Sequence, residues 1–309
     1  MTLDWISQPT LHRPALLAAF EGWNDAGDAA TDSLRWLMRR FDSELIATMD
    51  ADEYVDYQAT RPHVEIVSGT VRSVTWPSTN VFAVALPDDR DLVVVMGAEP
   101  NLRWPAFCTD ILDAADTLGC EAVVTLGALL ADTPHSRPPR ITGTTADESL
   151  LAQLSMRRSR YEGPTGIVGV LHNAAREAGF AASSLWVPVP HYVAAPPNPR
   201  ATRTLLEHLA TLLGLALDLT DLDISAAAWE RSVADVVAAD GEIAGYVARL
   251  EQRYDLDLDD DLDDTDDDGP NDPTASHPSG GMPSVEELPS GDALAADFER
   301  YLRDRDENA

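Results

Sequence analysis

The sequence predicts an α/β protein with a mostly parallel sheet covered by helices on both faces. Three observations indicate this class. Short apolar runs alternate with amphipathic helical patterns over the first ~215 residues, an order typical of parallel strands joined by crossover helices. The runs are continuously apolar, as in strands that are buried on both faces. Hydrophobic residues make up 44% of the 309-residue chain, enough for a sizeable core.

The expected elements follow from these patterns in chain order. Strands are predicted at residues 14–20, 43–49, 80–86, 91–97, 121–127, 165–171 and 184–190. Helices are predicted at 27–41, 102–118, 172–180 and 199–214, with a short helix ending the segment 141–154. A β-hairpin is predicted over 63–77, because two β-rich arms flank Ser68-Gly69. Residues 224–239 and 241–254 predict an appended αα-hairpin.

Charge excludes two classes of partner. The chain has 53 acidic and 22 basic residues, a formal net charge of -31, and no lysine. Nucleic acids and anionic membranes both require a basic face, so we expect neither as a partner. No apolar run is long enough to span a bilayer, and the first residues lack a signal-peptide pattern, so a cytoplasmic protein is predicted. Two cysteines, Cys108 and Cys120, form no disulfide framework.

The C-terminal region is the most acidic part of the chain. Residues 255–309 contain 19 acidic residues and three arginines. We predict a core domain at 1–215, the helical hairpin at 216–254, a disordered acidic linker at 255–290 and a terminal amphipathic helix at 291–309. The acids do not follow the order of an EF-hand loop. The terminal helix would dock on its own body, on a neighbouring subunit or on a partner protein.

Polar side chains follow five of the predicted strands. In an open α/β sheet, ligands bind outside the carboxyl ends of the strands. If the strands are parallel neighbours, these side chains meet at one rim. The predicted ligand-binding residues are Glu21, Trp23, Asn24, Asp25, Glu99, His135, Arg137, His172, His191 and Asn198.

The segment 21–30, EGWNDAGDAA, has two compatible interpretations. In the first, Asn24 or Asp25 caps the following helix and Asp28 favours its dipole. In the second, Glu21 and Trp23 also line a pocket. Neither interpretation requires a metal or a cofactor.

The remaining motifs predict no metal and no cofactor. His135, His172 and His191 raise the hypothesis of a zinc site, but no local ligand spacing supports it. The glycines of GPTGIVG (163–169) precede the predicted strand or lie within it, unlike a dinucleotide-binding fingerprint. Nucleophile-elbow and P-loop motifs are absent from the sequence.

Four blocks occur in the order of a known family. GWNDAGDAA, GALLADTPHSRP, GPTGIVGVLH and PHYVAAPPNPRAT resemble the proteasome assembly chaperone family in its actinobacterial branch, over about residues 14–214. The resemblance implies a core similar to purine nucleoside phosphorylases and certain carboxypeptidases. It also implies that the helical hairpin covers the pocket as a lid. Finally, it implies self-association through the β-hairpin around Ser68-Gly69, into a trimer.

Two main functions remain open at this stage. The first is an oligomeric, chaperone-like binding protein that captures a partner through its terminal helix. The second is a hydrolase or phosphorylase for a small anionic or nucleoside-like substrate. In the second case Arg137 would clamp an anion, His135 or His191 would act as acid or base, and Trp23 would stack on a ring. A structural subunit with a relic pocket is a third interpretation.

Overall fold

The computed structural model describes residues 3–67, 71–87, 90–145, 149–150, 154, 156–159 and 161–263. The chain divides into two compact units. The first comprises residues 1–130, 139–189 and 195–229, and the second comprises 131–138, 190–194 and 230–309.

A nine-stranded mixed sheet forms the centre of the first unit. Its strands lie in the order β1 (Leu3–Trp5), β3 (Asp42–Met49), β6 (Thr79–Ala85), β7 (Leu92–Ala98), β2 (Ala15–Glu21), β8 (Ala122–Ala131), β11 (Ala181–Pro190), β9 (Thr142–Thr145) and β10 (Arg157–Arg158). Strand β2 is parallel to β7 and to β8. The β1–β3, β3–β6, β6–β7 and β9–β11 pairs are antiparallel. The predicted α/β class is therefore confirmed, and the parallel part of the sheet is its centre.

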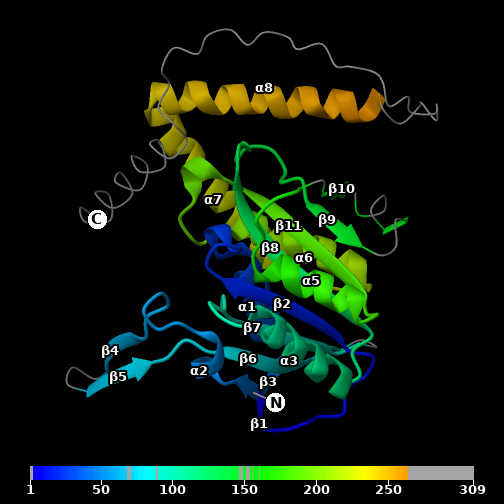
Figure 1. The fold of residues 1–309 in the computed structure, drawn as a ribbon. Coiled ribbons are helices and arrows are strands. Elements are labelled where there is room, and N and C mark those ends of the chain that lie inside the picture. The colour runs from blue at the N-terminus through cyan, green and yellow to red at the C-terminus, as the bar shows by residue number, and fades with distance from the viewer. Residues whose placement is uncertain are drawn as a thin grey trace. The chain divides into compact units, whose positions relative to one another are not determined.

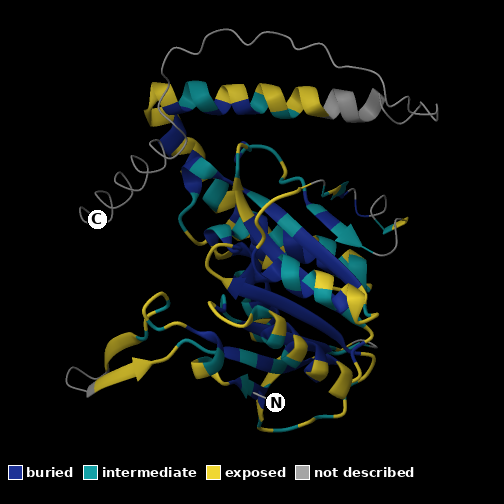
Figure 2. Ribbon diagram, in the orientation of Figure 1, coloured by how far each residue is buried: buried dark blue, intermediate teal, exposed yellow. Residues whose placement is uncertain are grey.

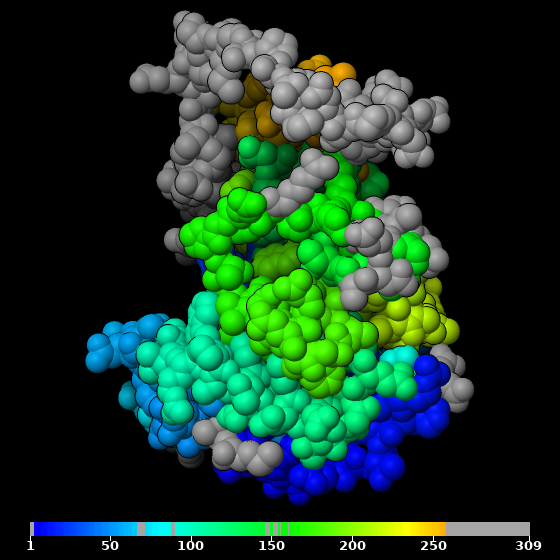
Figure 3. Space-filling view, turned by 45° about the vertical axis from the view of Figure 1, so that its right-hand side comes forward, coloured from blue at the N-terminus to red at the C-terminus, as the bar shows by residue number. Residues whose placement is uncertain are grey.

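Helices cover both faces of this sheet (Figure 1). Helices α1 (Ala29–Arg40) and α6 (Pro199–Leu213) pack on one face, and α3 (Trp104–Thr117) and α5 (Ile167–Glu177) pack on the other. Figure 3 shows α5 in bright green beside α3 on the surface. Side chains of β2 alternate between the two layers. Leu16 and Phe20 face α3 and α5, whereas Leu17 and Ala19 face α1 and α6.

The predicted strand at 165–171 is wrong, because these residues begin helix α5. The buried side chains Ile167, Val168, Leu171 and Ala175 lie on one helical face against the core. A short apolar run has the same appearance in a buried strand and in a buried helical turn, so periodicity alone does not separate them. As a consequence, His172 lies within a helix and not at the end of a strand.

The predicted hairpin strands are confirmed as β4 (His63–Val67) and β5 (Val71–Thr75). They form a separate two-stranded antiparallel sheet in which Val64 pairs with Val74. A short helix, α2 (Ala51–Tyr54), precedes the hairpin. The Ser68-Gly69 turn and most of the short helix predicted before residue 154 lie outside the described residues.

The two appended helices are longer than predicted. Helix α7 spans Thr220–Ala239 and α8 spans Gly241–Asp263. The prediction of an extended linker is therefore wrong for residues 255–263, because adding a residue to an existing helix avoids the cost of nucleation. The rest of the linker and the terminal segment 291–309 lie outside the described residues. Every helix in the described part of the chain is too short or too polar to cross a bilayer.

Candidate functional site

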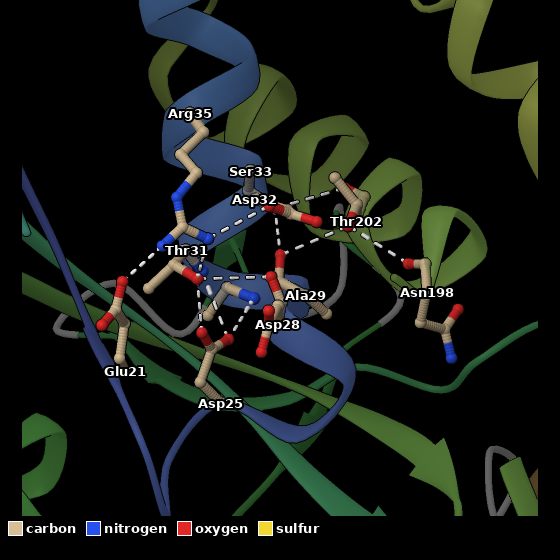
Figure 4. A network of polar contacts seen from close by, with 11 residues as sticks. Glu21, Asp25, Asp28, Ala29, Thr31, Asp32, Ser33, Arg35, Asn198 and Thr202 are labelled. Carbon is tan, nitrogen blue, oxygen red and sulfur yellow. Dashed lines mark hydrogen bonds and ion pairs between the residues drawn. The ribbon is translucent and has the colours of Figure 1, made fainter. Parts of the chain in front are cut away.

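The turn after β2 is held by the carboxylate of Asp25, which is 4% exposed. Asp25 Oδ1 accepts hydrogen bonds from Ala30 N at 2.7 Å and Thr31 N at 3.2 Å, and Oδ2 accepts one from Thr31 Oγ1 at 2.5 Å (Figure 4). Asp25 therefore caps α1, in agreement with the first interpretation of this segment. Burial raises the pKa of Asp25 to about 6, against the lowering effect of its hydrogen bonds with Thr31 and Ala30.

A second carboxylate holds the start of α5. Glu99 Oε1, from the segment after β7, accepts a hydrogen bond from Asn24 Nδ2 at 2.6 Å and another from Ile167 N at 3.0 Å. The backbone oxygen of Asn24 accepts a hydrogen bond from Ala128 N of β8 at 2.8 Å. Asn24 and Glu99 thus connect three neighbouring strands of the sheet to one helix. The sequence placed both residues at strand ends but did not predict that they pair.

Asn24 is completely buried against Gly166, the residue that precedes α5. Its Oδ1 has no hydrogen-bond partner among the described residues. A Cβ atom added to Gly166 would lie 2.1 Å from this oxygen and 2.5 Å from Nδ2. The close approach of the turn to α5 therefore requires glycine at position 166.

Three more of the predicted residues lie close to this turn. Glu21 forms an ion pair with Arg35 at 2.5 Å, as Figure 4 shows. Asn198 donates its backbone N–H to Gly27 O at 3.1 Å, and its Oδ1 caps α6 by accepting from Ala201 N at 3.0 Å. The Trp23 side chain is 66% exposed. The structure thus brings Glu21, Trp23, Asn24, Asp25, Glu99 and Asn198 together in the first unit.

His172 has a different role from the one expected. Its Nε2 lies 2.9 Å from Thr144 Oγ1 on β9. Burial and the nearby Arg176 lower the pKa of His172. This pairing joins α5 to an outer strand of the sheet.

His135 lies in the second unit. The Tyr192 hydroxyl lies 2.7 Å from His135 N and 2.8 Å from His135 Nδ1. The Tyr192 ring packs edge-on against the rings of His135 and Tyr246, and the Tyr246 hydroxyl donates to Asp132 at 2.9 Å. His191 begins the short 3-10 helix η2 (His191–Val193) and is half-buried.

Arg137 is bound by a carboxylate of the protein itself. Its Nε and Nη2 donate to the two oxygens of Asp255 at 2.9 and 2.8 Å. The neighbouring Ser136 bonds to Glu251, and the Tyr254 hydroxyl donates to Pro138 O at 2.8 Å. These contacts tie α8 to the segment 131–138 within the second unit.

Neither metal ligation nor thiol chemistry has support in the described residues. No group of three or more His, Cys, Asp or Glu side chains there is arranged to hold a metal ion. Cys108 and Cys120 are buried, and burial raises the pKa of each thiol to about 12. Such thiols stay protonated at neutral pH, and a protonated thiol is a weak nucleophile.

Side chains of the protein accept from some of the first backbone N–H groups of three helices in this region. Asp25 accepts from Ala30 and Thr31 of α1, Glu99 from Ile167 of α5 and Asn198 from Ala201 of α6. Such donors are where phosphate or carboxylate ligands bind in many α/β enzymes. The fold and this region therefore define a three-layer α/β protein in which four of the helix N-terminal donors at the strand ends bind side chains of the protein itself.

Comparison with known proteins identifies the family. The PAC2 family model matches residues 19–237, and the chain belongs to this family. The structure is similar to a PAC2 family protein of Streptomyces avermitilis, with 47% identity and a TM-score of 0.69, covering 76% of this chain and 99% of that one. It is also similar to a proteasome-assembly chaperone homologue of Mycobacterium tuberculosis, with 44% identity and a TM-score of 0.70, covering 75% and 99%.

A more distant structure shares the fold. The archaeal proteasome activator PbaB of Pyrococcus furiosus is 18% identical, with a TM-score of 0.60, covering 76% of this chain and 98% of that one. None of the curated proteins matches this sequence. The family resemblance predicted from the four sequence blocks is thus confirmed.

Proposed function

We propose that this protein is an oligomeric binding protein of the proteasome-assembly-chaperone type, and that it forms a trimer through the β4–β5 hairpin. The proposal rests on two supports. One is the 44% identity to the Mycobacterium tuberculosis proteasome-assembly chaperone homologue. The other is the apolar face of the hairpin, which is the observation that carries the self-association.

One face of the hairpin is apolar and exposed. Val64, Ile66 and Val74 share that face with Arg72, because Val64 pairs with Val74, Ile66 pairs with Arg72, and residues two apart on a strand point the same way. The exposed fractions of the three apolar residues, with that of Trp76 just beyond β5, lie between 49% and 65%. Both strands are yellow in Figure 2 wherever their burial is described. Exposed apolar patches of this kind mark protein interaction sites.

Charge favours a second copy of the chain as the partner of this face. At a net charge of -31, two copies repel each other over most of their surfaces. The strands β4 and β5 contain one acid, Glu65, and one base, Arg72. Arg72 pairs with Ile66 and so lies on the face of Val64 and Val74, whereas Glu65 pairs with Ser73 on the other face. The apolar face therefore carries one positive and no negative side chain of β4 and β5, and a second acidic copy is not repelled there.

The hydrolase or phosphorylase alternative has weaker support. A small anionic substrate would need free donors at the strand ends, and Asp25 and Glu99 already occupy three of those at the starts of α1 and α5. The Arg137 guanidinium is held by Asp255. Thermal-shift assays with inosine and inorganic phosphate test this alternative, because a clear stabilisation by either compound would restore it.

Sedimentation of the full chain tests the self-association. We expect the unaltered protein to sediment as a trimer and the Ile66→Asp, Val74→Asp double variant to sediment as a monomer. Ser73→Asp is the matched control, because Ser73 lies on the opposite face of the same hairpin. A monomeric unaltered protein, or a double variant that remains trimeric, would contradict the proposal.

The terminal segment 291–309 is proposed as a second binding element. It lies outside the described residues, and the support for it is its amphipathic sequence, with Leu294, Phe298, Tyr301 and Leu302 at helical spacing. Deletion of residues 264–309, which keeps α8 and the pair of Arg137 with Asp255, tests this role. Unchanged recovery of partner proteins by the shortened chain would count against it.

A further inference from the structure

A second exposed apolar surface lies at the carboxyl edge of the sheet. Trp23 is 66% exposed, and Leu129 and Leu130 are 39% and 41% exposed. The segments that bear them are adjacent, because Asn24 O accepts a hydrogen bond from Ala128 N and Asp25 forms a parallel bridge with Ala128. Leu129 and Leu130 are successive residues of β8 and point to opposite sides of the sheet. Leu129 is on the side of Val123, which faces α3 and α5, and Glu99 holds the start of α5 on that same side. We call Trp23, Leu129 and Glu99 the Trp23 surface.

Glu99 leaves one carboxylate oxygen open beside this turn. Both described hydrogen bonds of the Glu99 side chain go to Oε1. Oε2 lies 4.0 Å from the position that a Cβ on Gly22 would take, which places the half-buried carboxylate directly against the residue before Trp23. No described residue donates to Oε2. This oxygen is therefore available to a donor from outside.

We propose that the Trp23 surface binds a segment of another protein that presents an arginine or lysine flanked by apolar side chains. The proposal rests on the binding role proposed above, but not on the hairpin. The cation would donate to Glu99 Oε2 and lie over the Trp23 indole, whose face attracts cations. The apolar neighbours of the cation would cover Leu129 and the rim of the Trp23 ring.

Charge complementarity selects this chemistry over others. The chain has a net charge of -31, so a basic segment is attracted and an acidic one is repelled. An anionic small molecule is disfavoured, because Asp25 and Glu99 already cap α1 and α5. A second copy of this chain is as acidic as the first and is disfavoured for the same reason.

The test uses isothermal titration of the full chain at about 0.15 M salt, where the Debye length is about 8 Å and distant charges are screened. The probe is a short synthetic peptide with leucines on both sides of two arginines. The matched peptide has glutamates in place of the arginines. We expect the arginine peptide to bind and the glutamate peptide to bind at least about tenfold more weakly.

Two variants locate the binding. Trp23→Ala and Glu99→Gln should each weaken binding of the arginine peptide by roughly tenfold or more, as for interface hot spots. Glu99→Gln keeps an acceptor for Asn24 and Ile167, so the fold is preserved. Ile224→Ala is the control, since Ile224 is an equally exposed apolar residue of the first unit.

Three outcomes would overturn the proposal. Trp23→Ala could bind the arginine peptide like the unaltered protein. Both peptides could bind equally, which would indicate a purely apolar partner. Trp23→Ala could also change the sedimentation of the protein, which would make the surface a contact between copies. The peptide titrations do not depend on the trimer that the hairpin variants test. Each of the two proposals can therefore be contradicted while the other holds.

Discussion

Asn24 and Glu99 follow neighbouring strands, β2 and β7, and join at 2.6 Å through Asn24 Nδ2 and Glu99 Oε1. The same Oε1 accepts the first backbone N–H of α5. One carboxylate oxygen therefore fixes both the turn after β2 and the start of a helix that is distant in the chain. Hydrogen bonds to an ionised group are among the stronger ones in proteins.

Gly166→Ala should destabilise the protein by about 1–3 kcal/mol, the usual cost of forcing extra volume into a packed site. The added Cβ would lie 2.1 Å from the buried Asn24 Oδ1. Asn24→Ala removes the atoms that clash. The double variant should therefore be more stable than the sum of the two single effects indicates, a coupling that urea unfolding can measure.

Gly241→Ala serves as the control for this series. No atom lies within 4 Å of the position of its added Cβ, and Gly241 begins α8. Alanine has the higher helix propensity, so this variant should be neutral or slightly more stable. If the effects of Gly166→Ala and Asn24→Ala on the free energy of unfolding are strictly additive, the contact between the added Cβ and Asn24 does not cause the loss of stability in Gly166→Ala.

Asp25→Asn should change how stability depends on pH. The pKa of Asp25 is about 6 in the folded protein, against an ordinary value of 3.8, with burial as the main cause. A carboxyl group with a raised folded pKa stabilises the protein below the unfolded pKa, and this contribution is lost as pH rises through the folded value. Between about pH 4 and pH 7 the unaltered protein should therefore lose roughly 2–3 kcal/mol of stability relative to the Asp25→Asn variant.

Urea unfolding of both proteins at several pH values measures this difference. Asparagine still offers Oδ1 to Ala30 N and Thr31 N, so α1 keeps its cap. Asp28→Asn is the control, because Asp28 lies in the same turn but is exposed. If the stability of Asp25→Asn and of the unaltered protein changes with pH in parallel, a raised pKa of the buried Asp25 does not contribute to the pH dependence.

Much of this fold follows from sequence patterns, and the failures have identifiable causes. The continuous apolar run before Glu21 is β2, and Pro199 and Gly214 mark the two ends of α6 as predicted. The run around Ile167 was misassigned because a buried helical turn and a buried strand look alike in seven residues. Residues 255–263 are helical although their composition favours extended chain, because they continue α8.

The positions of Glu21, Asn24 and Glu99 in the fold were predictable, but their bonding was not. Strand-end reasoning placed Glu21, Asn24 and Glu99 at the carboxyl edge of adjacent parallel strands, and β2 and β7 are such a pair. The pairing of Asn24 with Glu99 depends on side-chain rotamers and on the path of the loop before Gly166, and neither leaves a periodic signal in the sequence. Likewise, the partner of Arg137, Asp255, is 118 residues away in the chain.

His172→Gln should reduce the loss of stability at mildly acidic pH. Burial lowers the pKa of His172 in the folded state below its ordinary value of 6.5. As the pH falls, His172 therefore takes up a proton in the unfolded chain before it does so in the folded protein. Stability is lost in this way as the pH falls below about 6.5. Glutamine does not titrate and still reaches Thr144, so the variant should lose less stability between about pH 7 and pH 5.5 in urea unfolding. His208→Gln is the control, and an equal gain there would contradict a specific role of His172.

Arg137→Ala should loosen α8 within the second unit. The guanidinium donates twice to Asp255 and lies 3.7 Å from Glu251, so its loss removes the cation that two acidic side chains of the helix share. We expect faster amide hydrogen exchange at residues 250–257, with a larger difference at low salt, because exposed ion pairs are screened by ions. Asp255→Ala should also speed exchange there, and the double variant should show less than the sum of the two single effects, because both changes remove the pair between Arg137 and Asp255. Arg231→Ala, an exposed arginine of α7, is the matched control. Unchanged exchange in Arg137→Ala would show that the apolar contacts of Ile243, Val247 and Leu250 suffice to hold the helix.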